Sequence, residues 1–374
     1  MSSLHTGTKP AYAIGLDVGG TKIAAGVVSG QGEMLERVAQ PTPRSGTGEA
    51  TLRLTLQLVG DLRRRHPGVR AIGVGAAGMV DWPDGHVRWA PNNSYRDVPL
   101  RAILAAETGL PAVVDNDANA AAWAEACLGA GVGHRDLLVL TVGTGIGAGL
   151  ILDGRLYRGA TGIGGEAGHI IVDPSGPRCG CGSAGCLEAM GSGSALGRAG
   201  RDAALRDPDG MLAWLAGGAD QVTGEAVFEA ARVGNATARA IFGQTGYWLG
   251  IGIASLVTLL DIELVVIGGG LSATGELLLG PARSSFERFV FARGHRRLPP
   301  IVSARLGAEA GIVGAALLAL GSVPDGTEET APATAADLVD HAAALAATMP
   351  PPLNSVKVPR LRKQQQLSAV HIIE

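Results

Sequence analysis

Three cysteines lie within eight positions of this 374-residue chain, at Cys179, Cys181 and Cys186, with glycines between them. In a chain that stays in the cytosol, such a cluster is more typical of a metal site than of disulfides. His169 would complete a tetrahedral Cys₃His set. Zinc prefers these ligands, and a zinc site with all four positions filled is structural. Free buried cysteines and a redox pair are the alternatives.

Two glutamates bracket this cluster. Glu166 stands in the segment Gly164-Gly-Glu-Ala-Gly-His169, and Glu188 follows the last clustered cysteine by two positions. A lone glutamate is usually a solvated surface residue, but a metal-bound knot would hold both of these in place. We expect them to present hydrogen-bonding groups to a polar ligand. Cys127, the fourth cysteine, is most simply a core residue.

Four carboxylate and amide side chains follow a short predicted strand, at Asp115, Asn116, Asp117 and Asn119. Each is able to cap the helix that the next residues predict, yet one cap suffices. A carboxylate at this place could instead accept the proton of an attacking hydroxyl group, as the catalytic aspartate of a kinase does. The sequence favours a catalytic carboxylate here, with helix capping as the alternative.

Two glycine-rich turns have the composition of phosphate-binding turns. The first is Gly19-Gly20-Thr21, followed by Lys22, and the second is Gly143-Thr144-Gly145. Glycine lets backbone N–H groups approach phosphate oxygens closely, although plain hairpin turns are the alternative. The chain has neither the P-loop pattern nor a dinucleotide-binding glycine motif in the required context. Asp17, just before the first turn, is a candidate to hold a hydrated Mg²⁺ or to cap the turn.

The elements around these turns repeat. Apolar segments flank both turns, over residues 12–28 and 137–152, which indicates a duplicated architecture with a cleft between its halves. A third glycine-rich strand end follows at residues 264–270. Apolar periodicity and composition predict helices over 49–65, 100–108 and 118–128, and strands over 69–74 and 112–114.

Composition places the chain among two-domain soluble proteins. The net charge of -3 does not indicate binding to nucleic acid or to an acidic membrane surface. No uninterrupted apolar run reaches the roughly 18 residues of a membrane span, and the polar first ten residues are unlike a signal peptide. We therefore expect a cytoplasmic protein without nucleic-acid or membrane partners. Residues 323–374 are rich in Pro, Ala, Thr and Glu and then in Gln, which predicts a flexible tail.

Four motifs resemble those of the ROK family (repressors, open reading frames, sugar kinases), and within it the bacterial ATP-dependent glucokinases. They are Leu16-Asp-Val-Gly-Gly-Thr-Lys22, Asn116-Asp-Ala-Asn-Ala-Ala-Ala122, Gly164-Gly-Glu-Ala-Gly-His169 and Cys179-x-Cys-Gly-x-x-Gly-Cys-x-Glu188. The resemblance spans residues 11 to 320 and implies an α/β fold, the duplicated ribonuclease-H architecture of actin and hexokinase. It implies a small lobe over 11–117, joined by a helix over about 308–320, and a large lobe over 118–307.

The same resemblance implies transfer of the terminal phosphoryl group of ATP to the 6-hydroxyl of glucose, with Asp117 as general base. Zinc would be structural, Mg²⁺ would accompany ATP, and the enzyme would be a homodimer or homotetramer. Beside Asp117, sugar hydroxyls would be held by Asn92, Asn116, Glu166, His169 and Glu188. The phosphates and the nucleotide would be held by Asp17, Gly19, Gly20, Thr21, Lys22, Gly143, Thr144, Gly145, Gly268, Gly269 and Gly270.

Several alternatives stay open within the resemblance. Another hexose or an N-acetylhexosamine is a possible substrate, although Cys181 argues against the fructokinases, in which histidine replaces this cysteine. A sugar-responsive repressor would need a helix-turn-helix domain ahead of residue 11, where only about ten residues stand. A sugar sensor without catalysis is opposed by the presence of Asp117. Related enzymes that use polyphosphate lack the cysteine cluster, so ATP is favoured as donor.

Overall fold

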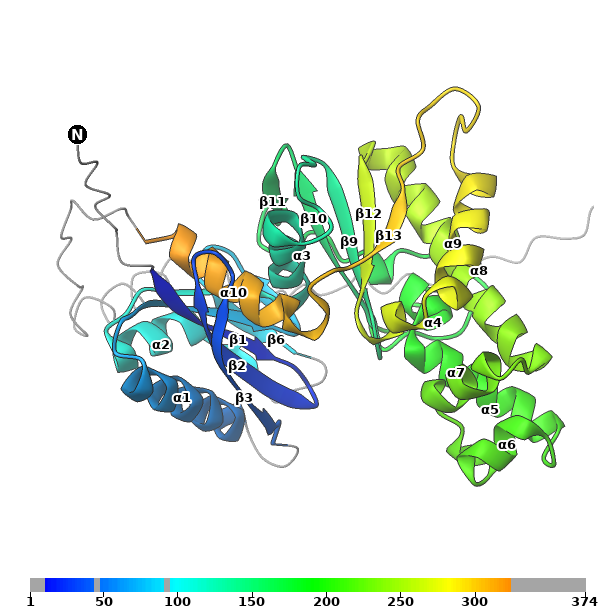
Figure 1. Ribbon diagram of the computed structural model, residues 1–374, viewed down its shortest axis with the longest axis horizontal. Coiled ribbons are helices and arrows are strands. Elements are labelled where there is room, and N and C mark those ends of the chain that lie inside the picture. The colour runs from blue at the N-terminus through cyan, green and yellow to red at the C-terminus, as the bar shows by residue number, and fades with distance from the viewer. Residues whose placement is uncertain (1–10, 44–47, 91–94, 324–374) are drawn as a thin grey trace, which may run out of the picture. The chain divides into compact units, whose positions relative to one another are not determined.

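A computed structural model describes residues 11–43, 48–90 and 95–323 of the chain, which belong to one compact unit. Asn92 and the predicted tail from residue 324 onward lie outside the described residues. The fold is built on two five-stranded sheets of identical topology, each with helices on both faces (Figure 1).

The first sheet has the strand order β3-β2-β1-β4-β8. The strand β2 runs antiparallel to both of its neighbours, β3 and β1, while β4 and β8 run parallel to β1. Helices α1 (Gly48–Arg65) and α2 (Leu100–Thr108) pack on one face. The strands are β1 (Tyr12–Val18), β2 (Lys22–Ser29), β3 (Met34–Pro41), β4 (Val69–Ala76) and β8 (Ala112–Asn116). Because both faces are covered, β1 and β4 are mainly apolar rather than alternating in polarity.

The second sheet repeats this plan in the order β11-β10-β9-β12-β13. Strands β9, β10 and β11 are again antiparallel, and β12 and β13 again run parallel to the first strand of the set. The strands are β9 (Leu137–Val142), β10 (Ile146–Leu152), β11 (Arg155–Tyr157), β12 (Leu264–Gly268) and β13 (Ile301–Ser303). The expected duplication is therefore confirmed at the level of sheet topology.

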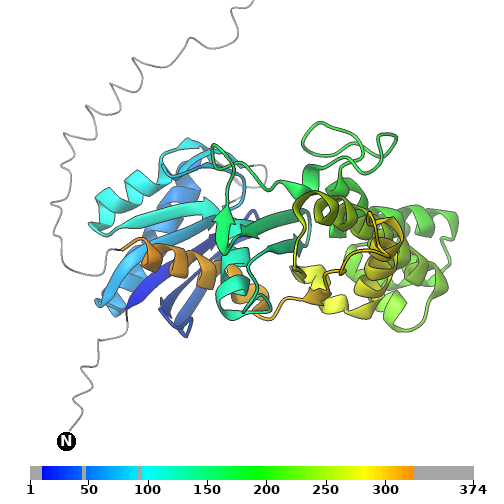
Figure 2. The ribbon, with the colours of Figure 1, turned by 90° about the horizontal axis from the view of Figure 1, so that it is seen from above.

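Two helices each follow one sheet in the sequence but pack on the other sheet. Helix α3 (Asp117–Leu128) follows the last strand of the first sheet but packs on β9 and β10 of the second. Helix α10 (Ala310–Gly321) follows the last strand of the second sheet but packs on β1 and β4 of the first (Figures 1 and 2). The two helices also touch each other, and a Cβ on Gly314 would lie 1.7 Å from the Ala120 carbonyl oxygen. Only glycine permits so close a crossing.

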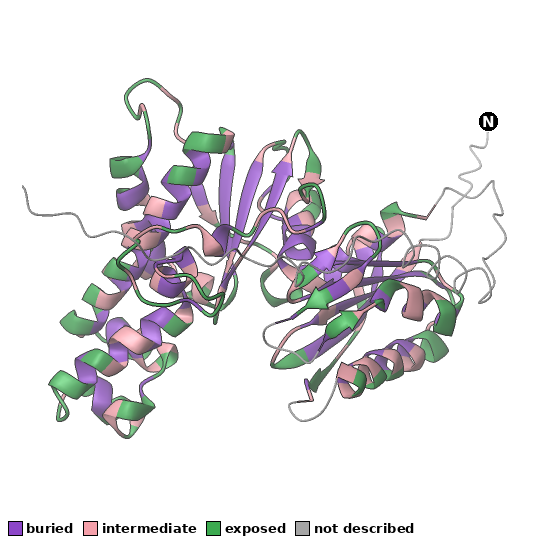
Figure 3. Cartoon of the chain, turned by 180° about the vertical axis from the view of Figure 1, so that it is seen from behind, coloured by how far each residue is buried: buried purple, intermediate pink, exposed green. Residues whose placement is uncertain are grey.

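A cluster of helices covers the far face of the second sheet and buries its largest apolar core (Figure 3). They are α4 (Leu187–Gly191), α5 (Gly193–Arg206), α6 (Met211–Ala216), α7 (Gly224–Arg232), α8 (Ala236–Leu260) and α9 (Glu276–Phe289). Among the described residues, α8 alone is long and apolar enough to cross a membrane by length and composition. Half of its most apolar 18-residue stretch is buried, and Gly246 and Gly250 lie directly against α9. Its apolar surface is thus used in packing within the protein.

The remaining strands form a small sheet in the order β5-β6-β7, and single-turn 3₁₀ helices complete the structure. The strands are β5 (Met79–Asp81), β6 (His86–Trp89) and β7 (Arg96–Val98), and the 3₁₀ helices are η1 (Ala167–His169), η2 (Ala219–Gln221), η3 (Gly270–Thr274) and η4 (Gly307–Glu309). Together η4 and α10 match the expected helix over 308–320.

The predicted helices over 49–65, 100–108 and 118–128 are confirmed as α1, α2 and α3, with ends that differ by one residue at most. The prediction that Cys127 is a core residue is wrong, because its side chain is exposed. It lies in the last turn of α3, past the alanines that pack between the sheets. The division into lobes near residue 117 stays a prediction.

Candidate active site

The four polar side chains at the junction of β8 and α3 have different hydrogen-bonding roles. Asn116 caps the helix, since its Oδ1 accepts hydrogen bonds from the N–H groups of Ala118 (2.8 Å) and Asn119 (3.2 Å). Its Nδ2 donates to the Gly78 carbonyl oxygen at 3.1 Å. The cap fixes the first turn of α3 and uses most of the hydrogen-bonding capacity of Asn116.

Asp115 and Asn119 are buried and bonded to each other. Asp115 Oδ1 accepts from Asn119 Nδ2 and from the Asn116 N–H, both at 2.8 Å. Its other oxygen, Oδ2, accepts from Arg158 Nε at 2.7 Å. These contacts satisfy Asp115 within the protein, and it lines neither of the two cavities described below.

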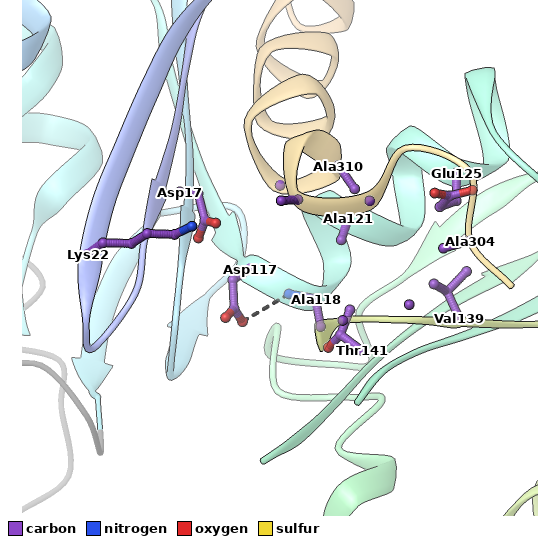
Figure 4. Close-up of a pocket in the computed structure, with 15 residues that line it drawn as sticks. Asp17, Lys22, Asp117, Ala118, Ala121, Glu125, Val139, Thr141, Ala304 and Ala310 are labelled. Carbon is purple, nitrogen blue, oxygen red and sulfur yellow. Dashed lines mark hydrogen bonds between the residues drawn. The ribbon is translucent and has the colours of Figure 1, made fainter. Parts of the chain in front are cut away.

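Asp117 is different, because its carboxylate faces a cavity of about 210 Å³ between the two sheets (Figure 4). It accepts a hydrogen bond from the Ala118 N–H at 2.9 Å. Asp17, at the end of β1, and Lys22, at the start of β2, line the same cavity, and Figure 4 shows the Lys22 amine turned toward Asp17. Gly268 and Gly269 line it from the end of β12. We call this the smaller cavity.

The two aspartates of the smaller cavity hold their protons more tightly than ordinary carboxyl groups. The pKa of Asp17 is raised to about 6, mainly by burial and also by the negative charge of Asp117, while the positive charge of Lys22 acts in the opposite direction. Burial likewise raises the pKa of Asp117, against a lowering effect of its backbone hydrogen bonds. Raised carboxyl pKa values in a cleft are typical of sites that handle protons or cations.

A larger cavity of about 730 Å³ lies on the second sheet and its helices. The turn residues Gly143 and Thr144 line it, as does Gly270, and Lys22 lines both cavities. Apolar walls come from Leu196, Phe228, Phe242 and Leu271. A cavity of this size with apolar walls and a glycine turn at one end suits a small molecule that carries a ring system and phosphates.

The Gly143 turn is held by the first turn of α5. The Gly193 N–H donates to the Gly143 carbonyl at 2.7 Å, and the Ser194 N–H donates to the Thr144 carbonyl at 3.2 Å. The other predicted turn, Gly19 to Thr21, is braced by Thr42, whose hydroxyl donates to the Gly19 carbonyl at 2.7 Å. Its residues Gly19, Gly20 and Thr21 line neither of the two cavities, and neither does Gly145.

The four expected metal ligands lie together. One donor atom from each of His169, Cys179, Cys181 and Cys186 lies within 4.8 Å of the others. The Sγ atoms of Cys181 and Cys186 are 3.6 Å apart, and Cys179 Sγ is 3.6 Å from His169 Nδ1. Metal–sulfur bonds of about 2.3 Å in a tetrahedron place two sulfurs roughly 3.7 Å apart. The donor set and its spacing therefore fit a four-coordinate zinc ion.

Glu188 ties this cluster to the second turn. Its Oε2 accepts from the Ile146 N–H at 3.0 Å, directly after Gly145, and its Oε1 lies 3.6 Å from Cys179 Sγ. A Cβ on Gly145 would lie 2.3 Å from Glu188 Oε2, so a larger residue there would displace this carboxylate from the Ile146 N–H. Partial burial raises the pKa of Glu166, the His169 ring lowers it, and the negative charges of Asp117 and Glu188 raise it. Electrostatically, Glu166 thus shares one neighbourhood with Asp117, His169 and Glu188.

Two charged residues near the site were not expected from the sequence. Glu125 of α3 lines the smaller cavity at the end far from Asp117, and its carboxylate accepts backbone N–H groups from three residues: Ala130, Arg305 and Leu306. Arg158 binds Asp115. The sequence could have indicated that Glu125 is buried, because it stands among the alanines of a helix that packs on both sides. An arginine directly before a glycine-rich loop was the only signal for Arg158.

Comparison with known proteins agrees with this geometry. The family model described as "ROK family" matches residues 13–322. A glucokinase of Streptomyces coelicolor is 43% identical over 309 residues, which are 82% of this chain and 96% of that protein. The crystal structure of a ROK family glucokinase from Streptomyces griseus in complex with glucose and AMPPNP is 42% identical. It has a TM-score of 0.77 and covers 83% of this chain and 100% of that one. An N-acetylmannosamine kinase of Yersinia pseudotuberculosis is 33% identical over 319 residues, 83% of this chain and 99% of that protein. With its family model and sheet topology in agreement, this chain belongs to the ROK family.

Proposed function

We propose that this protein is an ATP-dependent glucokinase, which forms glucose 6-phosphate and ADP. The observation that carries the proposal is the carboxylate of Asp117, which faces a cavity beside Asp17 and Lys22 while Asn116 caps the helix. The match to glucokinases over most of the chain supports glucose as the acceptor.

The proposed chemistry needs one proton acceptor and one aligned phosphate. The 6-hydroxyl oxygen of glucose attacks the γ-phosphorus of ATP, and its proton passes to Asp117 as the new P–O bond forms. The bond from the γ-phosphorus to the β–γ bridging oxygen breaks, and ADP leaves with the electron pair. The raised pKa of Asp117 brings this base nearer to the working pH, which favours proton transfer.

ATP would occupy the larger cavity, with its phosphates directed along the Gly143 turn toward Lys22. Lys22 supports this direction because it lines both cavities, so a phosphate chain that reaches it approaches Asp117. Mg²⁺ supplies charge neutralisation to the phosphates when it accompanies ATP, and Asp17 offers the hard oxygen ligand that this ion prefers.

Zinc would be held by His169, Cys179, Cys181 and Cys186 as a structural ion, with no open coordination position for chemistry. Its role would be to fix the loop that carries Glu166 and the start of α4 that carries Glu188. These two glutamates and His169 are proposed to bind sugar hydroxyls, as is the remaining amide hydrogen of Asn116. The expected homodimer or homotetramer and the cytoplasmic location stay predictions, and light scattering measures the former.

One assay tests the proposal. The purified protein is tested in a coupled assay that crosses glucose, mannose, fructose, N-acetylglucosamine and N-acetylmannosamine with ATP, GTP and polyphosphate. We expect the highest kcat/KM for glucose with ATP. A higher kcat/KM for an N-acetylhexosamine would replace glucose as the substrate but keep the kinase mechanism. No phosphoryl transfer to any sugar would refute the proposed function.

A further inference from the structure

A buried ion pair joins two segments that are 43 residues apart in the sequence. Arg158 follows β11, an edge strand of the second sheet, and Asp115 lies in β8, an edge strand of the first. Arg158 Nε donates to Asp115 Oδ2 at 2.7 Å. Only 14% of the Arg158 side chain and 4% of the Asp115 side chain are exposed. Loss of one partner would leave an unpaired charge out of contact with water, so the two groups depend on each other.

At the Asp115 end, the pair acts on both sides of Asp117. The second carboxylate oxygen of Asp115 accepts from the backbone of Asn116 and from the side chain of Asn119, both at 2.8 Å. These two residues flank Asp117 in the first turn of α3. The carboxylate of Asp115 therefore braces the backbone from which the Asp117 side chain projects.

At the Arg158 end, the pair fixes the loop that leads to Glu166 and His169. The Arg158 guanidinium carbon lies 3.6 Å from the centre of the Trp82 ring, just beyond β5. The backbone N–H of Trp82 donates to the Thr161 carbonyl at 3.1 Å. Gly162 passes so close to β5 that a Cβ there would lie 2.4 Å from the Val80 carbonyl oxygen. The loop is thereby held against the end of β5 in the small sheet.

We propose that Arg158 is a positioning residue for phosphoryl transfer, which rests on the proposed glucokinase function. Through Asp115 it sets the direction of the base Asp117, and through its own loop it sets the place of Glu166 and His169. A single guanidinium group thus fixes the spacing between the base and the side chains that bind the sugar. Arginine suits this role, because its planar group stacks on an aromatic ring and donates hydrogen bonds in its plane at the same time.

The test measures kcat and both KM values for Arg158→Gln and Arg158→Lys. A misplacement of about 1 Å costs on the order of 10²-fold in rate, so we expect kcat to fall about 10- to 100-fold in Arg158→Gln. The KM for glucose should rise, while the KM for ATP stays within about twofold of wild type, because neither Arg158 nor Asp115 lines the larger cavity. Arg158→Lys keeps the charge but not the planar group, so it should fold and still show most of the loss in kcat.

Two further variants separate positioning from stability. Arg135→Gln makes the same chemical change in an exposed ion pair with Asp153 and should leave kcat and both KM values unchanged. The double variant Asp115→Asn with Arg158→Gln leaves no unpaired buried charge, so its melting temperature should exceed that of Arg158→Gln while its kcat stays low. This variant and Arg158→Lys decide the question if Arg158→Gln does not fold.

Wild-type kcat and KM for glucose in Arg158→Lys or in the double variant would overturn the positioning role. Arg158 would then serve only to neutralise the buried charge of Asp115. If the wild-type enzyme prefers another hexose, the same variants are measured with that sugar, so failure of glucose as substrate is distinguished from failure of the inference.

Discussion

Asn116 caps helix α3 and thereby leaves the carboxylate of its neighbour Asp117 directed at the smaller cavity. The Asn116 side chain accepts the N–H groups of Ala118 and Asn119, which is the work of an N-cap residue. Asp117 adds only a second acceptor for the Ala118 N–H. The helix therefore does not require Asp117 as its cap, although a negative charge in the first turn of a helix is favourable.

Replacement of Asp117 with Asn should strongly reduce kcat and preserve the fold. The amide has nearly the same shape and still accepts a hydrogen bond, but it takes no proton from the sugar hydroxyl. Loss of a general base costs on the order of 10² to 10⁴ in rate, and we expect a fall of that size in kcat. Glucose should still bind, as measured by quenching of tryptophan fluorescence or by a rise in melting temperature.

The matched control for this prediction is Asp209→Asn, the same change at an exposed position. It should retain wild-type kcat. A kcat near the wild-type value in Asp117→Asn would contradict the proposed mechanism. Asp117 would then have only a structural role at the start of α3.

Metal content tests the cysteine cluster. We expect about one zinc ion per chain in the protein as purified, and Cys181→Ala should lose it, because a closed tetrahedral site needs all four ligands. Elemental analysis by mass spectrometry gives the count. Loss of the metal should also raise the KM for glucose, since Glu188 lies between Cys179 and the Ile146 backbone.

Cys127 supplies the control for this experiment. It is an exposed cysteine on α3 outside the cluster, so Cys127→Ala should keep its zinc and its activity. Fully active wild-type protein without any bound metal would contradict the structural role of zinc.

Glu125 should contribute strongly to stability. Its buried carboxylate accepts the N–H groups of Ala130, Arg305 and Leu306, which ties α3 to the segment that leads into α10. Glu125→Gln replaces one acceptor oxygen with an NH₂ group that faces backbone donors. Hydrogen bonds to charged groups contribute about 1.5–3 kcal/mol each, so we expect the free energy of unfolding to fall by roughly 2–3 kcal/mol in urea titration.

Glu107→Gln, an exposed change on α2, controls for the loss of a negative charge and should alter the free energy of unfolding by less than about 0.5 kcal/mol. An equally small effect in Glu125→Gln would show that the backbone groups find other partners.

The sequence allowed the duplicated sheets to be predicted, because apolar runs and glycine turns recur in the same order in both halves. The His169 and cysteine cluster was likewise predictable from ligand type and spacing. Which of Asn116 and Asp117 caps the helix was not, because both residue types serve as caps and only the backbone geometry decides. Burial of Glu125 and Arg158 was also beyond the sequence, since single charges are usually solvated and their partners are distant along the chain. Cys127 was misplaced for a related reason, because the end of α3 extends beyond its packed part.

The last prediction concerns the pH dependence of stability through Asp17. Its pKa in the folded protein, about 6, lies above the ordinary value of 3.8, so the folded chain holds this proton more tightly than the unfolded chain. The contribution to stability is complete below pH 3.8 and is lost as the pH rises through about 6. Asp17→Asn imitates the protonated group at every pH. The free energy of unfolding of Asp17→Asn should therefore exceed that of wild type by an amount that grows between these pH values. Above pH 7 the difference should reach at most about 2–3 kcal/mol.

Urea titrations of wild type and Asp17→Asn at pH 5, 6 and 8, in the absence of ATP and Mg²⁺, measure this difference. The same variant should lose most of its kinase activity at pH 8, because the proposed oxygen ligand for the nucleotide's Mg²⁺ is then an uncharged amide. A gain in stability together with a loss of activity would mean that the charge of Asp17 serves catalysis and lowers the free energy of unfolding. Equal stability of the two proteins at all three pH values would contradict the raised pKa of Asp17 and the burial that causes it.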